Sequence, residues 1–96
     1  MVLPPAVSEA LGPLLPRLLA EGFAPTELEQ SASFGDFIVA FSNARLHFAI
    51  ARDRGQFVVH GVERTMLEPA GLWRAFANHQ ELSPLLVQWL QSNEGA

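Results

Sequence analysis

The chain has 96 residues, 49% of them hydrophobic, which is enough for a modest core in one domain spanning residues 1–96. Its formal charge is −4, and its six basic residues are arginines scattered along the chain, which argues against a nucleic-acid-binding surface. Cysteine is absent, so disulfides, thiolate metal ligands and cysteine nucleophiles are excluded.

The N-terminal region predicts two short helices separated at a proline. Apolar residues recur there at near-helical spacing, and Pro13 disfavours a helical conformation at Gly12. We expect one helix over about residues 5–11 and a second that begins at Pro13, with Gly22 as its C-terminal cap. A single helix kinked near Gly12 is the alternative. Because prolines interrupt this region and it has no basic leader, we expect a cytoplasmic protein without a membrane span.

Residues 27 to 62 predict an antiparallel β-meander with one buried face. Three runs alternate between apolar and mixed residues with a period of two, and turn-forming residues separate the runs. A further strand at Thr26–Ser33 is expected at the sheet edge, with Leu28 and Ala32 pointing inward and acidic residues protecting the edge. The expected buried face of the other three strands consists of Phe37, Val39, Phe41, Leu46, Phe48, Ile50, Phe57 and Val59.

The pairing of these strands depends on where the two hairpins turn. A two-residue loop at Asn43-Ala44 would place Val39 opposite Phe48. In the preferred register, Ala51 faces Gln56 across the second hairpin. That register keeps all the residues of the expected buried face together, and it places His47 directly opposite His60 on the other face.

A competing register starts from the turn signal Asp53-Arg54-Gly55. A type I turn with a bulge at Gly55 would pair Arg52 with Gln56 and would turn Phe57 and Val59 away from the buried face. Because a slip by one residue moves every side chain of a strand to the opposite face, only one of these two registers can hold.

The C-terminal region predicts two helices. Pro69 can open a helix that carries Leu72, Trp73 and Phe76, and Ser83 can cap a second helix that begins at Pro84. The tryptophans Trp73 and Trp89 are expected to cover the sheet in the core, and a dimer or partner surface is the alternative for each. The predicted fold is therefore α+β, a four-stranded antiparallel meander with an N-terminal helix and two C-terminal helices packed on one face.

Few residues suggest catalysis or metal binding. His47 and His60 could share a metal ion, but a transition-metal site needs three or four ligands and no third ligand is evident. The carboxylates Glu27, Glu29 and Asp36 flank an edge strand and a turn, where solvation is expected. There is no nucleophile elbow and no glycine-rich phosphate loop. We therefore expect no catalytic residue, no cofactor and no resident metal.

The hairpin tip and the tryptophans indicate contact with a partner. An exposed hairpin tip can serve as a recognition element, and tryptophan is enriched in binding hot spots. The candidate contact residues are Arg52, Asp53, Arg54, His47, His60 and Trp73.

Three short segments carry a resemblance to known proteins. Ser33-Phe34-Gly35-Asp36, Ala44-Arg45-Leu46 and Arg52-Asp53-Arg54-Gly55-Gln56-Phe57 resemble a pattern in small uncharacterised bacterial proteins with a helix, a β-meander and C-terminal helices, some of them immunity-protein-like. The resemblance covers about residues 20–62 and implies no catalytic residues. It suggests a non-enzymatic protein-binding domain, immunity-like or adaptor, that acts on another protein or on a second copy of itself. The alternative is a small-ligand or metal-binding domain that uses the sheet face with His47 and His60.

Overall fold

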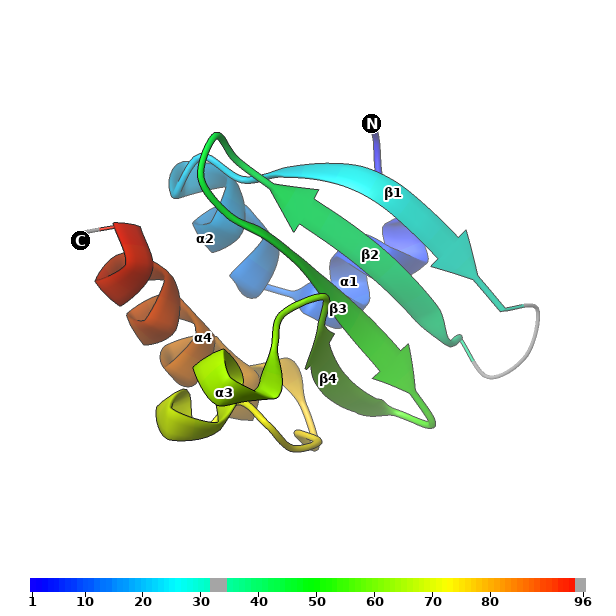
Figure 1. Ribbon diagram of the computed structural model, residues 1–96. Coiled ribbons are helices and arrows are strands. Elements are labelled where there is room, and N and C mark those ends of the chain that lie inside the picture. Colours follow the sequence, from blue (N-terminus) through cyan, green and yellow to red (C-terminus); the bar gives the residue numbers. More distant parts are fainter. Residues whose placement is uncertain (32–34, 95–96) are drawn as a thin grey trace.

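The computed structural model describes residues 1–31 and 35–94 and confirms the α+β prediction, with a four-stranded antiparallel sheet in the order β1-β2-β3-β4 (Figure 1). Its elements in chain order are α1 (Pro5–Leu11), α2 (Leu14–Ala20), β1 (Ala24–Gln30), β2 (Phe37–Ser42), β3 (His47–Asp53), β4 (Gln56–His60), α3 (Arg64–Leu67), the 3-10 helix η1 (Glu68–Ala70) and α4 (His79–Glu94).

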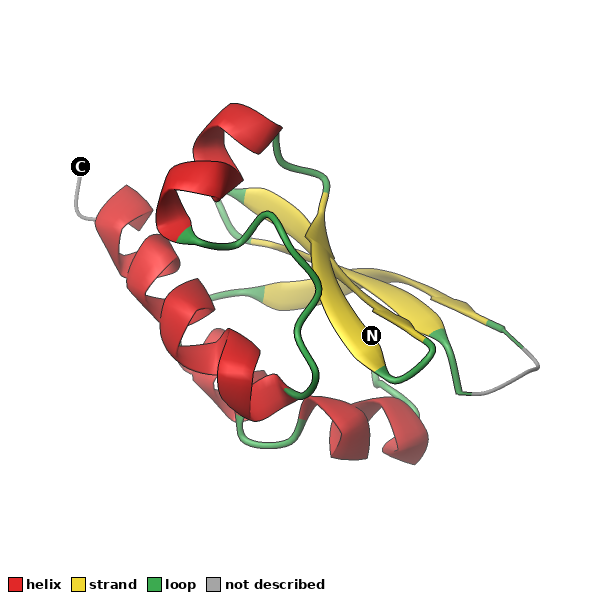
Figure 2. Cartoon of the chain, turned by 90° about the horizontal axis from the view of Figure 1, so that it is seen from below, coloured by secondary structure: helices red, strands yellow, loops and turns green. Residues whose placement is uncertain are grey.

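The helices cover one face of the sheet and leave the other uncovered. In Figure 1, α1 and α2 lie behind the strands and α4 runs beside them, while Figure 2 shows the twisted sheet extending away from the helices. None of the helices in the described part of the chain is long and apolar enough to cross a membrane.

Two short N-terminal helices form, as predicted. Pro13 is the N-cap of α2 and not its first residue, and Gly22 follows the helix with φ +87°. The amide of Phe23 donates to the Leu18 carbonyl and the amide of Gly22 donates to the Leu19 carbonyl, which closes the end of the helix.

β1 is the edge strand predicted for this region, although it runs from Ala24 to Gln30 and not over Thr26–Ser33. Leu28 lies opposite Val39 and is half-buried against the core, which confirms its inward direction. Ala32, the other residue expected to point inward, lies outside the described residues.

The first hairpin has a four-residue loop, Asn43 to Leu46, so the predicted two-residue loop was wrong. The Asn43 side chain stabilises the longer loop, because its Oδ1 accepts hydrogen bonds from the amides of Arg45 (2.9 Å) and Leu46 (2.8 Å). The register consequently shifts by two residues, and Phe41 now faces Phe48. A shift by two keeps each side chain on its predicted face, although Leu46 leaves the strand and is only half-buried.

The second hairpin follows neither predicted register. Asp53 pairs with Gln56 across a two-residue loop of Arg54 and Gly55, whose φ angles are +53° and +80°. Positive φ at both loop residues is characteristic of a type I′ turn, whose twist suits a hairpin. Phe57 and Val59 point inward, as in the preferred register.

The core forms between the covered face of the sheet and the helices, with Phe48 at its centre. The Phe48 ring lies 5.2 Å from that of Phe23, 5.8 Å from that of Phe41 and 6.4 Å from that of Trp89, measured between centroids. Trp89 is therefore in the core, as predicted. Burying these aromatic rings is the largest apolar contribution that a domain of this size can make.

The helix predicted to begin at Pro69 does not form. Pro69 lies in η1, the chain turns at Gly71 with φ +76°, and the next residues lead to a backbone pairing between Phe76 and Phe57. The two residues exchange amide-to-carbonyl hydrogen bonds of 2.8 Å each. This pairing and the burial of the Phe76 side chain favour the extended conformation over a helix.

The last helix begins earlier than predicted. Asn78 caps α4, because its Oδ1 accepts a hydrogen bond from the Glu81 amide (2.9 Å), and the Glu81 carboxylate accepts one from the Ala77 amide (3.1 Å). Ser83 and Pro84, predicted as cap and first residue, therefore lie inside the helix. The earlier start allows Leu82 to join the core.

Candidate functional site: the uncovered sheet face and Trp73

The uncovered face of the sheet has small residues at its centre. Ala40 and Ala51 are only 7% and 5% exposed, since larger neighbours surround them, whereas Ile38 is 43% exposed. Ala51 lies between Ile38 of β2 and Val58 of β4 in one cross-strand row. The row presents an apolar strip to solvent across three strands.

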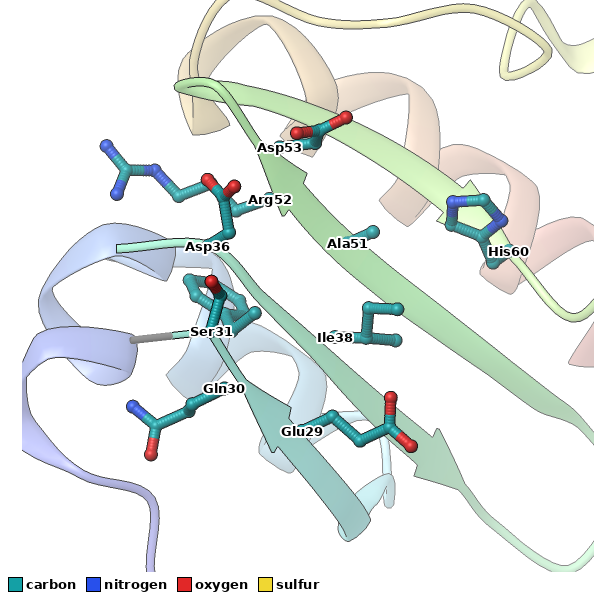
Figure 3. Close-up of a pocket in the computed structure, with 10 residues that line it drawn as sticks. Glu29, Gln30, Ser31, Asp36, Ile38, Ala51, Arg52, Asp53 and His60 are labelled. Atoms are coloured by element: carbon teal, nitrogen blue, oxygen red, sulfur yellow. The ribbon is translucent and has the colours of Figure 1, made fainter. Parts of the chain in front are cut away.

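A hollow of about 410 Å³ lies at this strip, and we call it the sheet hollow (Figure 3). Ile38 and Ala51 lie between Glu29 on one side and His60 on the other. Other polar residues that line the hollow are Ser31, Asp36, Arg52 and Asp53. The sheet hollow therefore combines an apolar base with a rim that is mostly polar and acidic.

A second hollow of about 330 Å³, the Trp73 hollow, lies where β4 meets the segment after η1. His60 lines both hollows, so they adjoin at this residue. Trp73 is 47% exposed, and the Arg64 guanidinium carbon lies 5.6 Å from the centroid of its ring. The expectation that Trp73 belongs to the core was wrong, because the helix predicted for this segment does not form and the indole is left exposed.

The tip of the second hairpin is joined to the turn before β2. The Arg54 amide donates a 3.0 Å hydrogen bond to Asp36 Oδ1, and Arg52 Nη1 donates one of 3.4 Å to the Gly35 carbonyl. Arg52 and Asp53 line the sheet hollow, while Arg54 is exposed at the tip and lines neither hollow. The structure thus brings four predicted contact residues, Arg52, Asp53, His60 and Trp73, to the two adjoining hollows.

The two histidines do not face each other as predicted. His60 pairs with Ala49, and His47 pairs with Ser42 at the far end of β3. The histidines share a face but are diagonal neighbours, for which Cα separations are roughly 7–8 Å. Among the described residues, no group of three or more histidine, aspartate or glutamate residues is placed to hold a metal ion. The prediction that His47 lies directly opposite His60 was therefore wrong.

The predicted contact residues leave out several residues of these hollows, among them Glu29, Ile38 and Arg74. The outward direction of Ile38 follows from the alternation of β2, because its neighbours Phe37 and Val39 point inward. The inward direction predicted for Leu28 already places Glu29 on the opposite face, but only the strand pairing shows that Glu29 lies beside Ile38. Arg74 could not be found from the pattern, since its segment was predicted to be helical.

Two acidic residues of β1, Glu27 and Glu29, lie on the uncovered face beside the sheet hollow. Glu27 and Glu29 are exposed, and neither takes part in a salt bridge within the described part of the chain, where the ion pairs are Arg17–Glu21 and Arg64–Glu68. The β1 side of this face therefore presents uncompensated negative charge.

No model of a protein family matches the chain, and no curated protein or solved structure is significantly similar to it. The resemblance to small bacterial meander proteins accordingly stays a prediction.

Proposed function

We propose that this protein is a non-enzymatic binding domain, immunity-like or adaptor, that contacts another protein through the sheet hollow and the adjoining Trp73 hollow. The observation that carries the proposal is that His60 lines both hollows and so joins them into one surface. A cytoplasmic location is part of the proposal.

The exposure of two large apolar side chains supports a protein partner. Ile38 is 43% exposed beside the sheet hollow, and Trp73 is 47% exposed beside the other. Binding hot spots are enriched in tryptophan, which offers a large area for burial and a polar N–H group. The polar rim around Ile38 matches the usual anatomy of an interface, in which polar residues surround an apolar centre.

Trp73→Ala is the direct test, and Leu19→Ala is its matched control. Leu19 is 50% exposed on α2, so its substitution removes a similar exposed apolar group away from both hollows. A partner would first be captured on wild-type protein from the source organism and then purified for calorimetric titration. We expect Trp73→Ala to weaken its binding by tenfold or more, while Leu19→Ala leaves it unchanged. Equal affinity of the two variants would remove the basis of the proposal.

The partner can also be a second copy of this chain. In that case sedimentation equilibrium will detect a dimer at micromolar concentration, which Trp73→Ala dissociates and Leu19→Ala does not. A dimer that resists Trp73→Ala would form through a different surface.

The second candidate function is binding of a small ligand in the sheet hollow. Its apolar base and its convergent polar groups, Glu29, Asp53 and His60, favour this reading. A fragment screen by two-dimensional NMR tests it, with saturable shifts expected at Ile38 and Ala51 and none at Trp73. If no fragment gives saturable shifts at Ile38 and Ala51, the hollow is not a small-ligand site.

A further inference from the structure

One side of β1 carries backbone groups that no backbone hydrogen bond joins to another residue in the described part of the chain. The Ser31 amide donates to the Asp36 carbonyl at 2.9 Å, and hydrogen-bonded pairs alternate along an antiparallel ladder. The backbone N–H and C=O groups of Glu29 and Glu27 therefore form hydrogen bonds with β2, whereas those of Leu28 and Gln30 point away from the sheet. No backbone hydrogen bond joins those outward groups to any described residue, the N-terminal residues before α1 included.

The two edges of the sheet differ in whether another segment of the chain pairs with them. On the β4 edge, Phe57 exchanges two hydrogen bonds of 2.8 Å with Phe76, so the chain itself pairs with that edge. On the β1 edge, the strand is interrupted by Pro25, which lacks an N–H, and by a bulge between Pro25 and Glu27. The bulge limits the regular free ladder to a short stretch, from Leu28 to Gln30.

Charge decides which strand can pair with this edge. Glu27 and Glu29 project from the uncovered face on either side of Leu28. If a second copy paired antiparallel about Leu28, Glu27 of each copy would lie opposite Glu29 of the other, and like charges directly opposite are destabilising. A strand with lysine or arginine at those two positions would gain two favourable pairs.

We propose that the β1 edge accepts a short extended segment of a basic partner protein as a fifth strand. The backbone groups of Leu28 and Gln30 would hold the segment, and Glu27 and Glu29 would select for basic residues. The inference rests on the proposed function, and it adds the chemistry of the partner. The two sites are connected because Glu29 and Gln30 also line the sheet hollow. The added strand would extend the binding surface past β1.

The test uses the whole chain and a synthetic peptide, acetyl-Val-Lys-Val-Lys-amide, with Lys at the positions that would face Glu29 and Glu27. In NMR titration at low salt, we expect saturable shifts at the Leu28 and Gln30 amides and slower solvent exchange of their protons. The matching peptide with Glu in place of Lys should not bind. Absence of saturable shifts at millimolar peptide, or equal binding of the two peptides, would overturn the inference.

Two substitutions separate this inference from the proposed function. Gln30→Pro removes an outward N–H and leaves the β1–β2 bonds intact, while Gln30→Ala at the same position keeps the N–H. We expect Gln30→Pro to weaken peptide and partner binding about tenfold relative to Gln30→Ala, the effect of losing one backbone hydrogen bond. If Trp73→Ala weakens partner binding but Gln30→Pro does not, the edge inference fails and the proposed function stands. If neither variant weakens it, both fail.

Discussion

The backbone N–H of Arg54 donates a 3.0 Å hydrogen bond to the carboxylate of Asp36, 18 residues earlier in the chain. This bond joins the tip of the β3–β4 hairpin to the segment that enters β2. It holds one end of the sheet hollow together, since Asp36 and Asp53 both line that hollow. The position of the hairpin tip therefore depends both on its own turn at Arg54-Gly55 and on the segment before β2 that carries Asp36.

Loss of this bond should loosen the hairpin tip. We expect Asp36→Ala to lower the free energy of unfolding by about 0.5–1.5 kcal/mol, the usual net value of one such hydrogen bond. Asp36→Asn keeps an oxygen acceptor and should lose less than half of that amount. Urea denaturation measures both, and a larger loss for Asn than for Ala would contradict the role assigned to the acceptor.

The Arg54 backbone conformation predicts a stabilising substitution. Arg54 is the only non-glycine residue with positive φ in the described part of the chain, at +53°. Asn-Gly is the preferred pair for a type I′ turn, so Arg54→Asn should stabilise the protein by roughly 0.5–1 kcal/mol. Arg54→Val should destabilise it by a similar amount, because a β-branched residue disfavours positive φ. Thermal unfolding of the two variants should give shifts of opposite sign.

The packing of His79 against Gly12 predicts a steric conflict. A Cβ atom on Gly12 would lie 2.8 Å from His79 Nε2, and Gly12 has φ +56°. Gly12→Ala should therefore cost about 2–3 kcal/mol, which combines backbone strain with the clash.

Two further variants separate strain from clash. Gly22→Ala meets nothing within 4 Å of its new Cβ and also has positive φ, so it should show the strain alone, about 1 kcal/mol. The double variant Gly12→Ala/His79→Ala should recover part of the loss. Strict additivity in that double-mutant cycle would show that the imidazole does not oppose the new methyl group.

The position at which α4 begins predicts different effects for the observed cap, Asn78, and for the cap predicted from the sequence, Ser83. Asn78→Ala should cost about 1 kcal/mol, because it removes the acceptor of the Glu81 amide. Ser83→Ala should change stability by less than about 0.5 kcal/mol, since Ser83 lies inside the helix and not at its start. Urea denaturation compares them, and a greater loss for Ser83→Ala would favour a helix start near Ser83.

The candidate surface was only partly predictable. Residues of the β3–β4 hairpin, such as Asp53, were identified because turn residues mark an exposed tip. Trp73 is among the predicted contact residues, but the helix predicted for its segment would place it in the core, and that helix does not form. The outward direction of Glu29 follows from the inward direction predicted for Leu28, whereas its position beside Ile38 depends on the strand pairing, which no local pattern encodes.

The sequence by itself determined which residues of β2 and β3 point inward, because alternation with period two assigns each side chain to a face. For β4 it left two registers with opposite faces, and the structure decided that Phe57 and Val59 point inward. The sequence also determined an interruption of the helix at Gly12, because Pro13 restricts the residue before it, and the structure decided for two helices over one kinked helix. Only the tertiary structure decided the strand registers, since a shift by two residues leaves every face unchanged and the hydrophobic pattern cannot distinguish the alternatives. The side-chain bonds of Asn43 and the positive φ of Arg54 set those registers. The pairing of Phe76 with Phe57 likewise required the folded sheet, and the segment around Trp73 is not the helix that the pattern predicts.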